Sequence, residues 1–204
     1  MSETKDKILD AAERLFGEQG YAETSLRHII ADAGVNLAAI HYHFGSKEDL
    51  LLQLIRRRAE PINQARLAML DRFEAEAGNE PVAVEKLVEA FLAPAAATAG
   101  GHPELVRLMG RMHAEGIMPP GIKNEFVPLV NRFIAAARRA LPDLPEEEFM
   151  WRLRAVAGAM AYTMLEVSAS TEDLNRRVHR LIAFLSGGLR APVASLEEKV
   201  EVTR

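Results

Sequence analysis

Hydrophobic residues recur along this chain at the spacing of α-helices. Ile8, Ala12 and Leu15 lie three and four residues apart, which places their side chains on one helix face. No segment alternates hydrophobic and polar residues as a half-buried β-strand does. The sequence therefore predicts an all-α protein.

Two short helices are expected after the first, joined by the turn Ala33-Gly34-Val35-Asn36. Thr24 or Ser25 would be the N-cap of the first short helix, and Asn36 can cap the second. Gly34 suits the left-handed backbone of such a turn. Two helices joined in this way form a helix-turn-helix, whose second helix enters the major groove of DNA. A plain helical hairpin within a bundle is the alternative.

A long fourth helix is predicted from Lys47 to about Glu76, with Pro61 as a kink or junction inside it. We therefore divide the chain into residues 1–60, residues 61–190 and a flexible tail, residues 191–204. Five further helices are predicted, at Val82–Ala97, Pro103–Glu115, Ile122–Leu141, Glu146–Ser168 and Leu174–Leu189.

The second helix of the hairpin divides into two faces. Leu37, Ile40 and Phe44 share the side expected to face the core. His41 lies at the flank of that side, where packing is as plausible as a base contact. Small residues followed by tyrosine would let the helix sink into a groove. The side chains expected to face outward are Ala38, Ala39, Tyr42 and His43.

Landmarks across residues 7–55 narrow the choice between these alternatives. They are Ala11-Ala12-Glu13-Arg14-Leu15-Phe16, Gly20-Tyr21, Thr24-Ser25, Ile29, Ala33-Gly34-Val35 and Tyr42-His43-Phe44, followed by Lys47. In these residues and their spacing the segment resembles the tetracycline-repressor (TetR) family. The resemblance implies an N-terminal three-helix DNA-binding domain and a helical domain that binds an effector and dimerises. It implies a regulator, most simply a repressor, that binds a palindromic operator in double-stranded DNA and is released by a hydrophobic small molecule.

The resemblance also implies a set of DNA contacts. Thr24 or Ser25, together with Arg27, would touch phosphates, as would Lys47 at the start of the fourth helix, where backbone N–H groups favour anions. Two residues depart from the family pattern: Ile30 replaces the usual alanine and His41 the usual tyrosine. Because Ala38 and Ala39 offer few polar groups, base specificity would rest on Asn36, His41 and DNA shape. The full set of expected contacts is Thr24, Ser25, Arg27, Asn36, Leu37, Ala38, Ala39, His41, Tyr42, His43 and Lys47.

Methionine and aromatic residues gather in the remainder of the chain. Methionine adapts to irregular apolar ligands, which predicts a hydrophobic effector pocket, although each of these residues could be plain core. A buried Arg111 near Met109 could bind a carboxylate. The stretch from Pro103 to Arg152 also resembles TetR-family regulators of fatty-acid metabolism. The expected pocket residues are Phe91, Met109, Arg111, Met112, His113, Phe133, Trp151 and Met160.

The last two predicted helices resemble the four-helix dimer interface of the family. The interface of a homodimer would contain Met160, Met164, Leu181 and Leu185, and an ordinary intrachain core is the alternative.

Charge and composition restrict the chemistry. The net charge is −4, and residues 1–60 hold eight Lys and Arg against ten Asp and Glu, so DNA contacts must come from locally placed donors. There is no cysteine, phosphate-cradling glycine loop, nucleophile elbow or zinc motif, so neither a cofactor nor enzyme activity is expected. A polar N-terminus and short apolar stretches predict a cytoplasmic protein without a membrane partner. A helical protein-interaction module, or an enzyme without a recognised motif, remains the alternative function.

Overall fold

The computed structural model describes residues 3–99, 103–116, 118–165 and 171–193, which form nine α-helices and no strand. The all-α prediction is thereby confirmed. None of the described helices is both long enough and apolar enough to cross a membrane. In chain order the helices are α1 (Glu3–Gln19), α2 (Leu26–Ala33), α3 (Leu37–His43), α4 (Lys47–Ala77), α5 (Val84–Ala99), α6 (Pro103–Ala114), α7 (Pro120–Ala140), α8 (Glu146–Leu165) and α9 (Thr171–Arg190).

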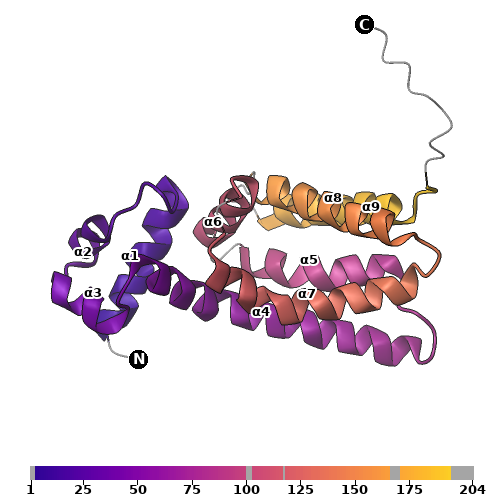
Figure 1. Ribbon diagram of the computed structural model, residues 1–204, viewed down its shortest axis with the longest axis horizontal. Coiled ribbons are helices and arrows are strands. Elements are labelled where there is room, and N and C mark those ends of the chain that lie inside the picture. The colour runs from indigo at the N-terminus through magenta and orange to yellow at the C-terminus, as the bar shows by residue number, and fades with distance from the viewer. Residues whose placement is uncertain (1–2, 100–102, 117, 166–170, 194–204) are drawn as a thin grey trace, which may run out of the picture.

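The described part of the chain is elongated, with α1, α2 and α3 gathered at one end (Figure 1). Helix α4 leaves this end and runs along the molecule, where it packs against α5 and α7. Helices α8 and α9 cover the other side of α5 (Figure 1). Helix α6 lies between the two parts and contacts both α1 and α8. The fold thus places one short helical unit at the tip of a larger bundle.

Side-chain caps fix where the short helices begin. Ser25 caps α2 by accepting a hydrogen bond from the His28 N–H at 3.2 Å, and Asn36 caps α3 through the Ala39 N–H at 2.9 Å. Gly34 ends α2 with φ of 64°, a left-handed conformation that a side chain would strain. The turn between α2 and α3 is therefore set by local chemistry.

Three apolar clusters form the core. The first joins Phe16, Ile29 and Ile40 to the start of α4 and takes in Leu108 and Met112 of α6. The second lies among α4, α5, α7 and α8, and the third between α5 and α9. Helix α4 continues through Pro61 and joins the first cluster to the second. A displacement of α4 or α6 would therefore change contacts in both the short helical unit and the larger bundle.

Candidate nucleic-acid interface

The helix-turn-helix is held in place by a buried threonine. The Thr24 hydroxyl is 2.8 Å from the Gly20 carbonyl oxygen and 3.2 Å from that of Leu15, and the side chain is 1% exposed. It donates inward, to the end of α1, and its single hydrogen has no capacity left for a phosphate. The expected phosphate contact of Thr24 is therefore wrong, and the N-cap is Ser25, whose side chain is exposed.

Helix α2 is tied to α1 by charge. Arg14 of α1 forms ion pairs with Asp32 of α2 and, at 3.1 Å, with Glu18 of its own helix. Arg27, on the outer side of α2, is exposed. The charged side chains between α1 and α2 therefore pair with one another. Arg27 lies outside this contact and is available to bind a phosphate.

Helix α3 presents the outward face that the helical periodicity predicts, except that Ala39 and His43 are partly buried. Ile40 is fully buried and Phe44 nearly so, whereas Ala38 is exposed and Tyr42 is 87% exposed. Ala39 differs, because it is partly buried and packs against the first core cluster. The side chain of Leu37 lies outside the described part of the chain.

The two histidines of α3 differ in environment. His41 is exposed, which decides against the packing role, and its Nδ1 lies 3.2 Å from the carbonyl oxygen of Gly45. Because a carbonyl only accepts, Nδ1 donates, and Nε2 of the neutral ring is left as an acceptor. His43 is half-buried, with its ring centroid 5.0 Å from that of Tyr42. His41 is thus the more accessible of the two to a base edge.

Lys47 begins α4 and reaches back to the loop between α1 and α2. Its Nζ donates to the Ala22 carbonyl oxygen at 3.3 Å and lies 4.3 Å above the Tyr21 ring. Burial lowers the pKa of Lys47, and the nearby Glu23 partly opposes that shift. One of the three ammonium hydrogens is used by this contact, so the group can still donate to a phosphate.

Lys5 is a cation near α3, the recognition helix of the helix-turn-helix. The sequence analysis did not predict this position. Its Nζ lies 5.7 Å from the centroid of the Phe44 ring, at the end of α3. No local motif marks this residue, because only the packing of α1 against the end of α3 brings it there.

The predicted effector residues do not gather at one place. Met112 is buried and Met109 partly buried in the first core cluster, whereas Phe91 and Phe133 belong to the second and pack edge to face at 5.0 Å. Met160 packs on the third cluster. Trp151 is 61% exposed and His113 is exposed, so neither lines a buried pocket. The Arg111 guanidinium lies against Gly20 at the end of α1, away from the aromatic pair.

The predicted dimer residues face the chain's own core. Leu185 is 4% exposed within the third cluster, and Leu181 and Met160 pack against that cluster. Leu185 is thus buried against α5, whereas the place of the partly buried Leu181 and Met160 at or beside a dimer interface stays a prediction. The side chain of Met164 lies outside the described part of the chain. The large exposed side chains of α8 and α9 are Trp151, Tyr162 and Phe184.

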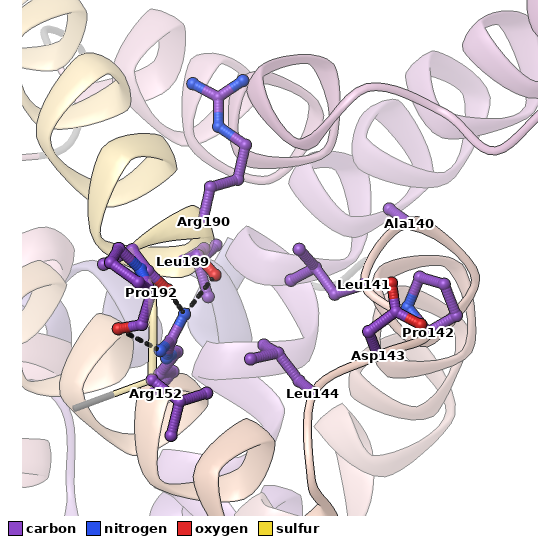
Figure 2. A pocket seen from close by; sticks show the side chains of 11 residues that line it. Ala140, Leu141, Pro142, Asp143, Leu144, Arg152, Leu189, Arg190 and Pro192 are labelled. Carbon is purple, nitrogen blue, oxygen red and sulfur yellow. Dashed lines mark hydrogen bonds between the residues drawn. The ribbon is translucent and has the colours of Figure 1, made fainter. Parts of the chain in front are cut away.

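A shallow pocket of about 290 Å³ lies where the α7–α8 connection meets the end of α9 (Figure 2). Arg152, one of its lining residues, donates to the carbonyl oxygens of Leu189 at 2.8 Å and Ala191 at 2.7 Å, and pairs with Glu148 at 2.7 Å. None of the predicted effector residues lines this pocket. Arg152 therefore uses its hydrogen bonds to cap the C-terminal end of α9.

Comparison with known proteins finds two family models that match this chain. Residues 8–54 match the family model of bacterial regulatory proteins of the tetR family, and residues 85–188 match that of the tetracyclin repressor-like C-terminal domain. The HTH-type transcriptional regulator AcrR of Shigella flexneri is 37% identical over 82 residues, which are 40% of this chain and 36% of that protein. The chain thus aligns with about a third of that relative's length.

Solved structures share this fold over most of the chain. A TetR-like transcriptional regulator from a Rhodococcus species superposes with a TM-score of 0.66 over 93% of this chain and 97% of its own, at 18% identity. A transcriptional regulator from Saccharomonospora viridis, solved in complex with choline, has a TM-score of 0.55 and 25% identity over 90% of this chain and 97% of its own.

The two matched segments together cover the helix-turn-helix and most of the bundle, and the named relatives are regulators and not enzymes. The chain belongs to the TetR family of DNA-binding transcriptional regulators.

Proposed function

We propose that this protein is a transcriptional repressor that binds a palindromic operator as a homodimer and leaves it when an apolar small molecule binds among the C-terminal helices. The description of the matched family as repressor-like supports the direction of regulation. The observation that carries the proposal is the pairing of an exposed recognition helix with a separate exposed aromatic face on α8 and α9.

The aromatic face is the proposed dimer interface. Trp151, Tyr162 and Phe184 are 61%, 63% and 71% exposed, although aromatic side chains of this size supply most of the stabilising contact area of interfaces. Residues of α8 and α9 on their other side already pack on α5. A second copy of the same two helices would cover the aromatic side chains and complete a four-helix contact about a two-fold axis.

The proposed DNA contacts lie on α2, α3 and the start of α4. Ser25, Arg27 and Lys47 would donate to phosphates, and the exposed Tyr42 would reach the backbone at the end of α3. His41 Nε2 is a candidate acceptor for the amino group of a base in the major groove. The remaining contacts proposed along the recognition helix are Asn36, Leu37, Ala38, Ala39 and His43.

Helices α4 and α6 would carry the effector signal, because both reach from the bundle into the first core cluster. A ligand releases DNA only when it binds more tightly to the state whose recognition helices are misplaced for two half-sites. Small displacements of α4 or α6 would change that separation.

Selection from random DNA duplexes tests the proposal. Enriched sequences are expected to share an inverted repeat whose half-sites lie about 34–36 Å apart, one turn of the duplex. Light scattering is expected to give twice the chain mass of 22.5 kDa. A monomer at micromolar concentration, or enrichment of no inverted repeat, would contradict it.

A further inference from the structure

Arg66, on α4, is a buried arginine without a carboxylate partner. It is 7% exposed, its Nε donates to the Phe91 carbonyl oxygen at 2.7 Å, and its Nη1 donates to the Asn63 side-chain oxygen at 3.0 Å. The guanidinium carbon lies 4.3 Å from the centroid of the Phe91 ring. All these partners are neutral, and none of the described acidic side chains pairs with Arg66.

The other arginines with little exposure are neutralised. Arg152 pairs with Glu148 at 2.7 Å, and Arg58 pairs with Glu13 at the same distance. Burial of Arg66 lowers its pKa only to about 10, so the group is still charged at neutral pH. Holding an uncompensated charge out of water costs free energy that an anion beside it would recover.

A structural role accounts for only part of this arrangement. Pro94 has no N–H, so the Ala90 carbonyl in α5 loses its helical donor, and Arg66 donates to the carbonyl of the next residue, Phe91. A neutral donor such as glutamine could supply the same hydrogen bond. This role does not explain why the side chain is positively charged. It also leaves three N–H groups of the guanidinium beyond the two hydrogen bonds.

The surroundings of the guanidinium suit an apolar molecule with an anionic end. Phe91 packs edge to face on Phe133 of α7 at 5.0 Å, and Phe91 is only half-buried. Arg66 lies five residues after Pro61, about 7.5 Å further along α4, close to where α4 passes from the first core cluster into the second. A ligand held here would act directly on the helix that reaches both parts of the chain.

We propose that Arg66 binds the carboxylate of an apolar monocarboxylate effector, whose apolar body packs against Phe91 and Phe133. The inference rests on the proposed effector response and names the ligand class of that response. Nη hydrogens of Arg66 donate to the carboxylate oxygens, a charge-assisted contact that an uncharged ester cannot match. A positively charged ligand, such as the choline bound by the Saccharomonospora relative, is disfavoured beside the same guanidinium.

Calorimetric titration of the full chain with matched probes tests the inference. The probes are decanoate and 4-phenylbutanoate, the methyl ester of each, and decyltrimethylammonium. Wild-type protein is expected to bind at least one of the two acids about tenfold or more tightly than its ester, and to bind the ammonium compound most weakly. Equal affinity for acid and ester in both pairs, or no binding of either acid at millimolar concentration, overturns the proposal.

Substitutions assign the preference to Arg66. Arg66→Met is expected to lower the affinity for the acid about tenfold and to leave the ester unchanged, whereas Arg66→Lys keeps part of the preference. Arg72→Met, at an exposed position of the same helix, is the matched control and should behave as wild type. A preference for the acid that survives in Arg66→Met overturns the proposal. If Arg66→Met does not fold, the wild-type comparison and Arg66→Lys decide.

Parallel mobility shifts separate this inference from the proposed function. A wild-type DNA complex that forms but shows no difference between acid and ester counts against Arg66 as the anion site and leaves the regulator in place. Failure to bind any DNA counts against the proposed function, while calorimetry, which uses no DNA, still decides the role of Arg66.

Discussion

At the scale of single residues, buried polar side chains join the DNA-binding unit to α4. Glu13 of α1 accepts from Arg58 of α4 at 2.7 Å, and its side chain is nearly enclosed. Arg57, next along α4, pairs with Asp10 at 2.6 Å. These contacts make α1 follow any movement of the first half of α4, because separating them would leave charges without partners in a partly enclosed site.

Glu13→Gln is expected to destabilise the fold by roughly 2 kcal/mol, since Arg58 would lose its close carboxylate and keep only the longer contact with the exposed Asp10 at 3.6 Å. Chemical denaturation measures this difference. Glu3→Gln is the matched control, because Glu3 pairs with Lys7 on the open surface of the same helix and should give no measurable change. Equal effects of the two substitutions would contradict the assignment.

Salt dependence separates the two kinds of DNA contact. Lys47→Ala is expected to weaken operator binding and to lower the slope of log affinity against log salt by about 0.9 for each protomer, because one phosphate charge is no longer neutralised. Tyr42→Ala should weaken binding at every salt concentration without changing the slope, since tyrosine carries no charge. Fluorescence anisotropy measures both. Unchanged affinity in both variants would mean that another surface faces DNA.

Periodicity predicted which residues of α3 face the core, because Ile40 and Phe44 follow helical spacing. It could not choose between Thr24 and Ser25 as the N-cap, since both carry hydroxyl groups with similar capping preference. The carbonyl groups of Leu15 and Gly20 decide that choice, and they lie on another helix and its end. Residues fixed by local chemistry were predictable, and residues fixed by packing were not.

At the scale of helices, α6 packs closely on α1 at a glycine. A Cβ on Gly17 would lie 2.6 Å from the Glu104 Cβ and 2.8 Å from its backbone Cα, so a side chain there cannot be accommodated without moving α6. Glycine in a helix interior is otherwise unfavourable compared with alanine. The close approach therefore explains why this position of α1 carries no side chain.

Gly17→Ala is expected to lower stability by about 1–2 kcal/mol, because overpacking outweighs the gain in helix propensity. Gly121→Ala is the control, since its added Cβ would meet Leu52 at an ordinary 3.8 Å and should cost little. Thermal unfolding compares the two variants. A stabilised Gly17→Ala variant would contradict the close α1–α6 contact.

The ion pair between α4 and α7 should make the free energy of unfolding depend on pH in the acidic range. Arg132 donates to Glu74 at 2.8 Å and holds the pKa of that carboxyl below its usual value. Because the unfolded chain binds the proton more readily, this contribution is present above the ordinary glutamate range near pH 4 and is lost as pH falls below it. Glu74→Gln should thus lose up to about 1 kcal/mol at neutral pH, with a smaller further loss in acid than wild type.

Denaturation at pH 7 and pH 3 measures that difference, with the exposed Glu80→Gln as control. A Glu74→Gln variant with the acid sensitivity of wild type would show that the ion pair with Arg132 does not contribute to folding.

Helix positions were predicted well, and the direction in which the last two helices face was not. Helix α8 begins at the expected Glu146, because Pro142 and Pro145 precede it, and α9 ends within one residue of the expected Leu189, shortly before Pro192. Both faces of these helices are apolar, however, and adjacent residues Phe184 and Leu185 point to opposite environments. Helical periodicity identifies an apolar face, but only the packing on α5 shows which of the two apolar faces is buried within the chain.

At the scale of the whole molecule, α8 and α9, which carry the exposed aromatic side chains, lie apart from the recognition helix α3, with α6 between them (Figure 1). Dimerisation through the bundle would leave both recognition helices open to DNA and fix their separation. Affinity for a palindrome would then depend on the aromatic face, although no residue of that face touches DNA.

Adjacent substitutions on α9 test this arrangement. Phe184→Glu is expected to raise the dimer dissociation constant about 100-fold or more while the monomer keeps its helical content, because the charge enters only the proposed interface. Leu185→Glu should instead unfold the bundle, because Leu185 is 4% exposed within the third core cluster. Sedimentation, circular dichroism and binding to one or two half-sites distinguish these results. A Phe184→Glu protein that stays dimeric and binds the full palindrome with wild-type affinity would move the interface elsewhere on the molecule.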